Sequence, residues 1–246
     1  MTTHVIFRVK PGMVSLFLVI LKFCVFSSTA AANNVPQAGE GRSLPDGFVY
    51  LTDVVPDVIL EIRYYSADNF MGSRVDSYNA PVAILSREAA EALRKAGQVL
   101  DSQGYVIKIF DAYRPQSAVA HFVRWAKDSG DNANKEYFYP GVDKANLFKL
   151  GYISEKSAHS RGSTVDLTIV DKKTGREVDM GSPFDFFGEI SRPDSNQVTP
   201  EQKANRMILQ KAMLDAGFLA IKTEWWHFRL AEEPYPDSYF DFPVDF

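Results

Sequence analysis

Apolar side chains recur every three or four residues along three stretches of the chain, the period of a helix with one buried face. The first stretch follows Ser86, which predicts an N-cap there and a helix that ends at Gly104. Its apolar face comprises Ala89, Leu93, Ala96 and Leu100. A second helix is predicted over residues 116–129, before Gly130. A third begins at Thr199 with a capping box completed by Gln202 and ends at Gly217.

Alternating or β-rich segments lie between these helices. They predict strands over residues 58–64, 105–110, 163–170, 176–178, 218–221 and 224–229. Residues 172–175 (Lys-Lys-Thr-Gly) have the composition of a hairpin turn. Because hairpins occur beside helical connections, the pattern favours an α+β fold over a doubly wound parallel sheet. We predict a single domain with a central, mostly antiparallel sheet flanked by helices.

The first 32 residues have the layout of a secretory signal peptide. Basic residues precede an apolar run, and small residues follow it up to Ala32. Residues 33–47 are rich in Asn, Pro, Gly, Gln and Ser and predict a flexible linker, so the folded domain is expected over residues 48–246. The alternative is an uncleaved membrane anchor, but Lys22 interrupts a run that is short of the roughly 20 apolar residues a span needs. We therefore predict export, to the periplasm, without stable membrane insertion once the signal is removed.

Composition narrows the classes of function. The 246 residues are 46% hydrophobic and 24% charged, which excludes disorder over the whole length and a disulfide-stapled miniprotein. Residues 1–32 hold three basic side chains and no acidic one, so their removal changes the net charge from −4 to −7. With no basic patch, no nucleic-acid partner is expected. Cys24 is the one cysteine and lies in the signal, which excludes cysteine nucleophiles and thiolate metal ligands from the mature chain.

Two short segments combine histidine with an acidic side chain. His159 and Asp166 are seven positions apart, and Asp166 lies between Val165 and Leu167 in a predicted strand. A carboxylate among apolar residues is costly to bury unless it binds a cation or an ionic partner. Imidazole and carboxylate are both good zinc ligands. The alternative is a loop histidine with an aspartate paired to Arg161.

The segment Glu224-Trp225-Trp226-His227 is the second of these. A catalytic zinc site needs three protein ligands and one open position. His227 completes such a set with His159 and Asp166, and Glu224 is then free to act as a general base. On a regular strand Glu224 and His227 face opposite sides, so this hypothesis requires a bulge or twist. The alternative is a buried aromatic strand with an incidental Glu and His.

Arg114 follows the predicted strand over residues 105–110 and precedes Pro115. At a strand end, its guanidinium is placed to stabilise negative charge on a substrate oxygen, with Asp111 orienting it. The alternative is a purely structural Asp111–Arg114 pair. His121 is interpreted as a partly buried residue of a helix face. The H-E-x-x-H and G-x-S-x-G motifs are absent, as are phosphate-binding glycine loops.

These motifs resemble those of a known family. Residues 157–168 (SAHSRGSTVDLT), 224–227 (EWWH) and 111–115 (DAYRP) are similar to the D-alanyl-D-alanine dipeptidases. These are zinc enzymes within the wider LAS group of peptidoglycan peptidases. Residues 65–70 and 179–186 add to the resemblance, which extends from about Val49 to Arg229. It implies the fold of that group, shared with hedgehog-type domains.

The resemblance also implies roles for individual residues. His159, Asp166 and His227 match the ligands of one Zn²⁺ per chain. Glu224 matches the catalytic base, and Arg114 matches the residue that stabilises the reaction's negative charge. Residues that match or are expected to adjoin the substrate site are Ser157, Asp185, Tyr64, Tyr78 and Asp111.

The function expected from the resemblance is zinc-dependent hydrolysis of the dipeptide D-Ala-D-Ala, in turnover or recovery of cell-wall fragments. One alternative is a zinc D,D-carboxypeptidase that trims peptidoglycan stem peptides, which would use the same metal site with a more open pocket. Another is a non-catalytic, zinc-stabilised binding domain, against which the presence of Glu224 and Arg114 argues. The antibiotic-resistance enzymes of this family lack a signal peptide, whereas this sequence is expected to have one. This difference concerns the physiological role more than the chemistry.

Overall fold

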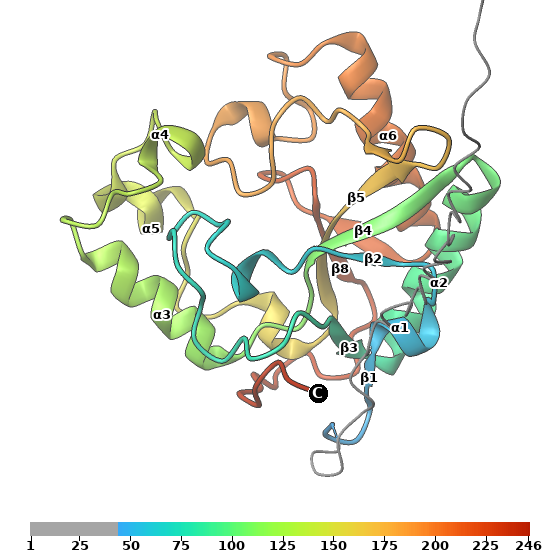
Figure 1. The fold of residues 1–246 in the computed structure, drawn as a ribbon, viewed down its shortest axis with the longest axis horizontal. Coiled ribbons are helices and arrows are strands. Elements are labelled where there is room, and N and C mark those ends of the chain that lie inside the picture. Colours follow the sequence, from blue (N-terminus) through green and yellow to red (C-terminus); the bar gives the residue numbers. More distant parts are fainter. Residues whose placement is uncertain (1–43) are drawn as a thin grey trace, which may run out of the picture. The chain divides into compact units, whose positions relative to one another are not determined.

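The computed structural model describes residues 44–246 (Figure 1). The predicted signal peptide and residues 33–43 of the predicted linker lie outside the described residues. Residues 44–47, the end of that linker, are held against the domain. The carbonyl of Gly47 accepts a hydrogen bond from the Arg87 amide at 2.8 Å, and the Asp46 carbonyl accepts one from the Tyr235 hydroxyl at 3.2 Å.

The main sheet has the strand order β2-β4-β5-β8-β7, with β6 paired to the end of β5. Its strands are β2 (Ile59–Leu60), β4 (Tyr105–Asp111), β5 (Thr164–Asp171), β6 (Arg176–Glu177), β7 (Phe218–Ala220) and β8 (His227–Leu230). The β2–β4 pair is parallel and the other pairs are antiparallel. The predicted α+β class with a mostly antiparallel sheet is confirmed. A small antiparallel sheet of β1 (Phe48–Tyr50) and β3 (Ile84–Ser86) was not predicted.

One face of the main sheet is covered by α2 (Arg87–Ser102) and α6 (Pro200–Asp215), which also contact each other (Figure 1). Both helices were predicted with their caps. The Ser86 hydroxyl accepts a hydrogen bond from the Ala89 amide at 3.4 Å, and Thr199 and Gln202 form the capping box. At Gly97 of α2, a β-carbon would lie 3.5 Å from Cδ1 of Ile107. The helix therefore packs closely against Ile107 of β4.

The remaining helices are α1 (Leu51–Val54), α3 (Gln116–Lys127), α4 (Lys135–Phe138), α5 (Leu147–Leu150) and the 3₁₀ helices Arg63–Tyr65, Lys144–Asn146, Ala158–Arg161 and Glu189–Ser191. Of these, α3, α4 and α5 lie on the other side of the sheet from α2, whereas α1 lies beside α2 (Figure 1). The predicted helix over 116–129 is confirmed but ends two residues earlier. The elements between residues 130 and 157 were not predicted. Lys144 connects the 3₁₀ helix Lys144–Asn146 to the loop after α3, since its buried ammonium donates to the carbonyls of Asp128 and Asp131 at 2.7 and 2.5 Å.

Two predicted strands differ from the expected ranges by more than one residue at one end. The strand over 58–64 was wrong beyond Leu60, because the chain turns into a 3₁₀ helix in which the Arg63 guanidinium donates to the Asp68 carbonyl at 2.7 Å. The strand over 224–229 begins only at His227, after a turn at Trp225 and Trp226. Within residues 44–246, no helix is both long and apolar enough to cross a membrane.

Candidate active site

Three acidic and basic side chains lie in one row across the middle strands of the sheet. Asp166 of β5 is directly opposite Asp111 of β4 on one side and His227 of β8 on the other. Directly opposed residues of antiparallel strands project from the same face. The register of β4 shifts between Ile109 and Asp111, and this irregularity turns Asp111 to the face that carries Asp166.

His159 reaches the row from the 3₁₀ helix Ala158–Arg161. The Ser157 hydroxyl caps that helix by accepting a hydrogen bond from the His159 amide at 3.3 Å. The helix ends at Gly162, where φ is +80° and a β-carbon would lie 2.3 Å from the Phe48 ring, so only glycine fits. The His159 Nδ1–H donates to the Ala112 carbonyl at 2.7 Å. Because Nδ1 is occupied by this bond, Nε2 is the ring nitrogen that faces Asp166.

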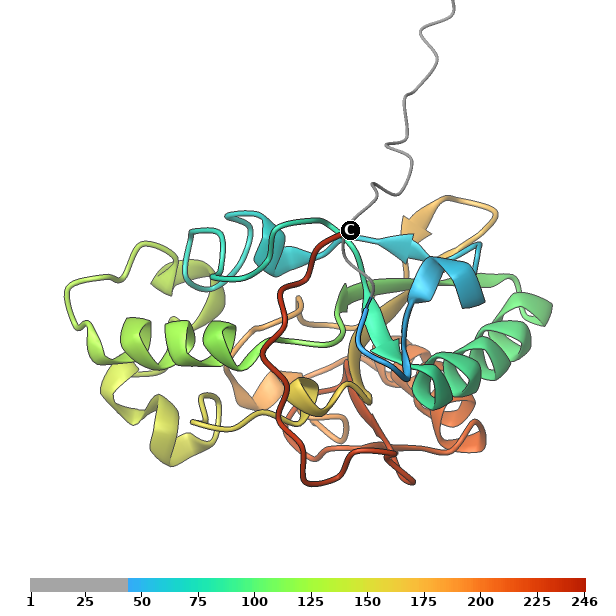
Figure 2. The same cartoon turned by 90° about the horizontal axis from the view of Figure 1, so that it is seen from below.

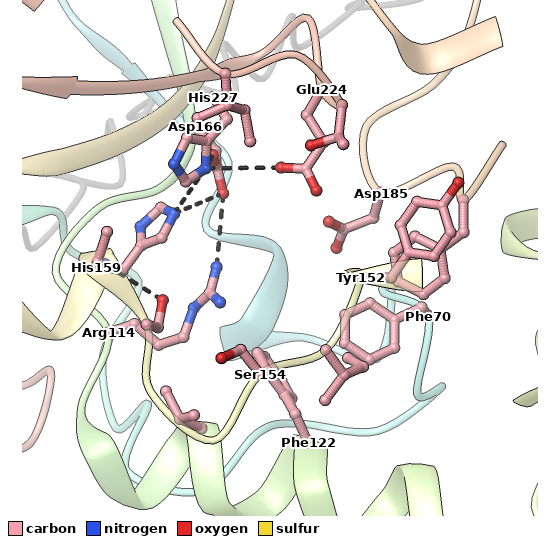
Figure 3. Close-up of a pocket in the computed structure, with 18 of the residues that line it drawn as sticks. Phe70, Arg114, Phe122, Tyr152, Ser154, His159, Asp166, Asp185, Glu224 and His227 are labelled. Atoms are coloured by element: carbon pink, nitrogen blue, oxygen red, sulfur yellow. Dashed lines mark hydrogen bonds and ion pairs between the residues drawn. The ribbon is translucent and has the colours of Figure 1, made fainter. Parts of the chain in front are cut away.

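The potential ligand atoms of His159, Asp166 and His227 all lie within 4.8 Å of one another (Figure 3). His159 Nε2 is 3.2 Å from Asp166 Oδ2, and His227 Nδ1 is 3.0 Å from Asp166 Oδ1. Asp166 is buried, and its Oδ1 has no well-oriented hydrogen-bond donor among the described residues. Two imidazoles thus lie beside one buried carboxylate, whose Oδ1 lacks a well-oriented donor. This set of groups fits a divalent metal of the zinc type.

The charged groups of the cluster shift one another's pKa values. Burial opposes ionisation of Asp166, but the imidazoles of His159 and His227 outweigh it and hold the pKa of Asp166 well below its usual range. Burial likewise opposes protonation of His227, yet the neighbouring Asp166 carboxylate raises the pKa of His227. Asp166 is therefore an anion at neutral pH, as a metal ligand must be.

Glu224 lies in the loop before β8, and its Oε2 is 3.6 Å from His227 Nδ1 (Figure 3). The turn at Trp225 and Trp226 meets the geometric requirement that the sequence left open, since it places Glu224 and His227 on the same side. Burial raises the pKa of Glu224 to about 7, with Asp166 adding to the rise while His227 and Arg114 oppose it. A carboxyl with a pKa near neutrality can both accept and release a proton. The two tryptophans are buried and do not line the cavity.

Arg114 is fixed between an acidic partner and two aromatic rings. Its Nε and Nη2 donate to Asp111 Oδ2 at 2.9 and 2.7 Å, and Nη2 lies 3.6 Å from Asp166 Oδ2. The guanidinium carbon is 5.0 Å from the ring centre of Tyr64 and 5.1 Å from that of Phe122. The Asp111–Arg114 pair thus exists, and the same arginine also lines the cavity beside the cluster. Arg161, the alternative partner for Asp166, instead bonds Glu233 at 2.7 and 2.8 Å.

A cavity of about 180 Å³ adjoins the metal-ligand cluster. This is below the roughly 300–1,000 Å³ of pockets for drug-sized ligands, so the site suits a very small molecule. Its walls include the aromatic side chains of Phe70, Phe122, Tyr152 and Phe187, and Asp185 points into it (Figure 3). Asp185 is buried in a left-handed backbone conformation with φ of 59° and accepts a hydrogen bond from the Tyr64 hydroxyl at 2.9 Å. Burial, followed by the charge of Asp166, raises the pKa of Asp185 well above its usual range.

The comparison with known proteins agrees with this geometry. A family model for D-Ala-D-Ala dipeptidases, in peptidase group M15, matches residues 45–245. The chain belongs to this dipeptidase family. A D-alanyl-D-alanine dipeptidase of Enterococcus faecium is 42% identical over 198 residues, which cover 80% of this chain and 98% of the relative. Proteins of the same name from Enterococcus faecalis and Escherichia coli are 41% and 34% identical, covering 82% and 75% of this chain and 100% and 84% of their own lengths.

Membership of the dipeptidase family makes the protein a metallopeptidase. It also argues against the non-catalytic binding domain considered from the sequence. The fold observed for residues 44–246 is consistent with that of the family.

Not every residue predicted at the substrate site adjoins the cavity of this dipeptidase-family chain. Ser157, Tyr64 and Asp185 line it. Tyr78 and Asp111 do not, because both are almost completely buried and the Tyr78 hydroxyl donates to Asp111 Oδ1 at 2.5 Å behind Arg114. Tyr78 thus supports Asp111, which in turn bonds Arg114, and neither side chain is part of the cavity wall. That they take part in substrate binding stays a prediction.

Two segments outside the cluster remain to be compared with the sequence analysis. His121 lies outside the cavity, where its Nδ1 accepts a hydrogen bond from the Asp76 amide at 3.1 Å. Residues 151–156 form one wall of the cavity and were missed. They have no periodicity or motif, so no sequence signal marks them.

Proposed function

We propose that this protein is a zinc-dependent dipeptidase that hydrolyses D-Ala-D-Ala to two molecules of D-alanine. One observation carries the proposal: the convergence of two imidazoles and a buried carboxylate at a very small cavity, with the Glu224 carboxyl beside them. Family membership supports the same reaction, since the relatives described above are named D-alanyl-D-alanine dipeptidases. The cavity's size favours a dipeptide over the carboxypeptidase alternative.

The metal would be held by His159, Asp166 and His227. Zinc in such a site supplies a Lewis acid and lowers the pKa of a bound water to about 7. Glu224 accepts a proton from the attacking water and delivers it to the leaving amine, a role that its pKa near 7 suits. The Arg114 guanidinium stabilises negative charge as it develops on the carbonyl oxygen, which lowers the barrier because that charge is absent from the ground state.

Recognition of the dipeptide's ends follows from the cavity's polar groups. Asp185 is a buried carboxyl. Within the described residues, the hydrogen-bond donor to its Oδ2 is the Tyr64 hydroxyl. The free ammonium of a dipeptide provides the positive charge that this carboxyl lacks. The Ser157 hydroxyl lines the cavity near His159 and is suited to donate to the substrate's carboxylate. A substrate with a blocked amino terminus lacks the positive charge that pairs with Asp185, and its blocking group must fit into the same small cavity.

A substrate panel tests the proposal. The purified protein is assayed with D-Ala-D-Ala, N-acetyl-D-Ala-D-Ala and a pentapeptide stem ending in D-Ala-D-Ala, each with and without a chelator, alongside metal analysis. We expect release of D-alanine from the free dipeptide only, loss of activity with the chelator, and about one zinc per chain. Rapid cleavage of the acetylated dipeptide or the stem peptide would replace the proposal with the carboxypeptidase.

We also propose that the chain is exported to the periplasm, with residues 1–32 removed, and acts there on cell-wall fragments. The layout of its N-terminus and the absence of cysteine after Cys24 support this. N-terminal sequencing of the protein from a periplasmic extract is expected to begin near Asn33. Recovery of the full-length chain in the cytoplasmic fraction would contradict it.

A further inference from the structure

The last residues of the chain run back across the domain next to the elements that carry the site (Figure 2). We call residues 239–246 the strap. They contain no helix and no named strand, yet their main chain is bonded to Tyr50 and to three segments near the site, which are residues 77–80, 113–116 and Ser160. The first of these segments contains Tyr78, the second contains Arg114, and Ser160 is next to His159.

Phe240 links the histidine side of the site to the arginine side. Its amide donates to the Ser160 carbonyl at 2.8 Å, and its carbonyl accepts from the Gln116 amide at 3.1 Å. Ser160 directly follows the potential ligand His159, and Gln116 is two positions after Arg114. One residue of the strap therefore ties together the backbone segments that present these two side chains.

Asp241 completes the helix that follows Arg114. The first amides of a helix need acceptors from outside it, and the N-cap residue normally supplies one. The N-cap of α3 is Pro115, whose side chain has no acceptor. Asp241 Oδ1 instead accepts from the Ser117 amide at 2.6 Å, and its negative charge lies at the positive end of the helix. The strap thus provides a cap that the local sequence lacks.

The strap also holds the chain just before Arg114. The ring of Tyr113 stacks on that of Phe242 with centres 4.1 Å apart and an angle of 15°, and its hydroxyl donates to the Phe242 carbonyl at 2.9 Å. Further on, Val244 bonds the main chain of Ser77 at 2.9 Å and of Asn79 at 2.8 Å, on either side of the tyrosine that supports Asp111. Arg114 is therefore held from both sides by one segment.

We propose that the strap positions the Arg114 guanidinium for the reaction, and that Asp241 is a positioning residue acting through the start of α3. This rests on the proposed dipeptidase function. Small displacements of a positioned catalytic group cost large factors in rate, whereas substrate binding in a cavity walled mainly by other residues is little affected. The strap thus acts on turnover rather than on binding.

The test compares Asp241→Ala and Asp241→Asn with the wild type and with Asp237→Ala, which removes an exposed carboxylate from the same C-terminal region. For Asp241→Ala we expect kcat for D-Ala-D-Ala to fall on the order of five- to ten-fold, the scale of losing one helix cap, with KM within about two-fold. Asparagine keeps an acceptor oxygen and is expected to restore most of the rate. Asp237→Ala is expected to match the wild type.

Two further measurements separate positioning from general weakening. In an Arg114→Ala background, Asp241→Ala is expected to change kcat by less than about two-fold, because the group it positions is gone. Hydrogen exchange is expected to quicken in residues 113–120 and to stay unchanged in α2. An unchanged kcat in Asp241→Ala, or an equal fall in both backgrounds, would overturn the proposal.

The proposal about the strap can be tested even if the proposed dipeptidase function fails or Asp241→Ala does not fold. If the wild type does not hydrolyse D-Ala-D-Ala, the proposed function fails, and unchanged exchange in residues 113–120 of Asp241→Ala would still refute the strap. If Asp241→Ala does not fold, Tyr113→Phe removes only the hydroxyl that bonds the Phe242 carbonyl. The same fall in kcat is expected there, and its absence would refute the strap as well.

Discussion

Replacing Arg114 by alanine removes a group that has two separate tasks in this structure. The guanidinium makes two hydrogen bonds to Asp111, whose side chain is completely buried, and it also lines the substrate cavity. The two tasks predict different losses. The first is a loss of stability and the second is a loss of rate, and they can be measured on the same variant.

The stability loss follows from the burial of Asp111. Removing one partner of a buried ion pair costs about 3–5 kcal/mol, because the other charge is left without compensation. Burial already raises the pKa of Asp111, while Arg114 and His159 oppose the rise. Without Arg114 the folded protein binds a proton at Asp111 more readily than the unfolded chain does. The destabilisation is therefore greatest at neutral pH and becomes smaller as the pH falls.

The rate loss follows from the position of Arg114 beside the cluster. Removing one group that stabilises developing negative charge costs about 10²–10³ in kcat. The assay is D-alanine release at saturating D-Ala-D-Ala, together with urea unfolding of the same preparation. The double variant Asp111→Asn/Arg114→Ala removes the uncompensated charge, so we expect it to regain part of the stability and none of the rate. A kcat for Arg114→Ala within about three-fold of the wild type would refute the catalytic role. Recovery of rate in the double variant would show that only folding was affected.

Three other substitutions test separate parts of the site and its support. Glu224→Gln is expected to lower kcat by about 10²–10⁴ while one zinc per chain is retained, measured by metal analysis and turnover. Asp185→Asn is expected to raise KM more than it lowers kcat, because it removes the partner of the substrate's ammonium. Glu233→Gln is expected to lower Tm at pH 7 by about 4 °C. Burial opposes ionisation of Glu233, but Arg161 and Arg229 hold its pKa below the usual 4.5, so the Tm difference should shrink as the pH falls below about 4.5.

The parts of the fold that sequence predicted are those determined by neighbouring residues. The Ser86 and Thr199 caps, the apolar face of α2 and the alternation of β5 all express interactions over a few positions. The strand expected over 58–64 ends at Leu60, and residues 63–65 form a 3₁₀ helix instead. Besides the nearby bond from Arg63 to the Asp68 carbonyl, this helix makes a contact that sequence does not reveal, since the Tyr64 hydroxyl bonds Asp185, 121 positions away.

The candidate site was predictable in its chemistry and only partly in its geometry. After residue 32 the chain has three histidines and no cysteine, so it offers few ways to bind zinc, which is why His159, Asp166 and His227 were identifiable. The convergence of Asp166 and His227 depends on strand register, and the place of Asp111 beside them depends on the irregularity in β4; neither has a local signal. The cavity wall at residues 151–156 and the C-terminal strap have no periodic pattern. Their roles come from the surfaces on which they lie, which the sequence does not reveal.

The row formed by Asp111, Asp166 and His227 belongs to three central strands, whereas the cavity's far wall comes from loops and short helices outside the sheet. Hydrolytic chemistry and substrate choice therefore reside in parts of the molecule with different mechanical support. Changes in length or side chains around Tyr152 can reshape which dipeptide is accepted without moving the metal ligands. Insertion or deletion of one residue in β5 before Asp166 shifts the register by one, turns this ligand to the opposite face of the sheet and is expected to end hydrolysis of every substrate alike.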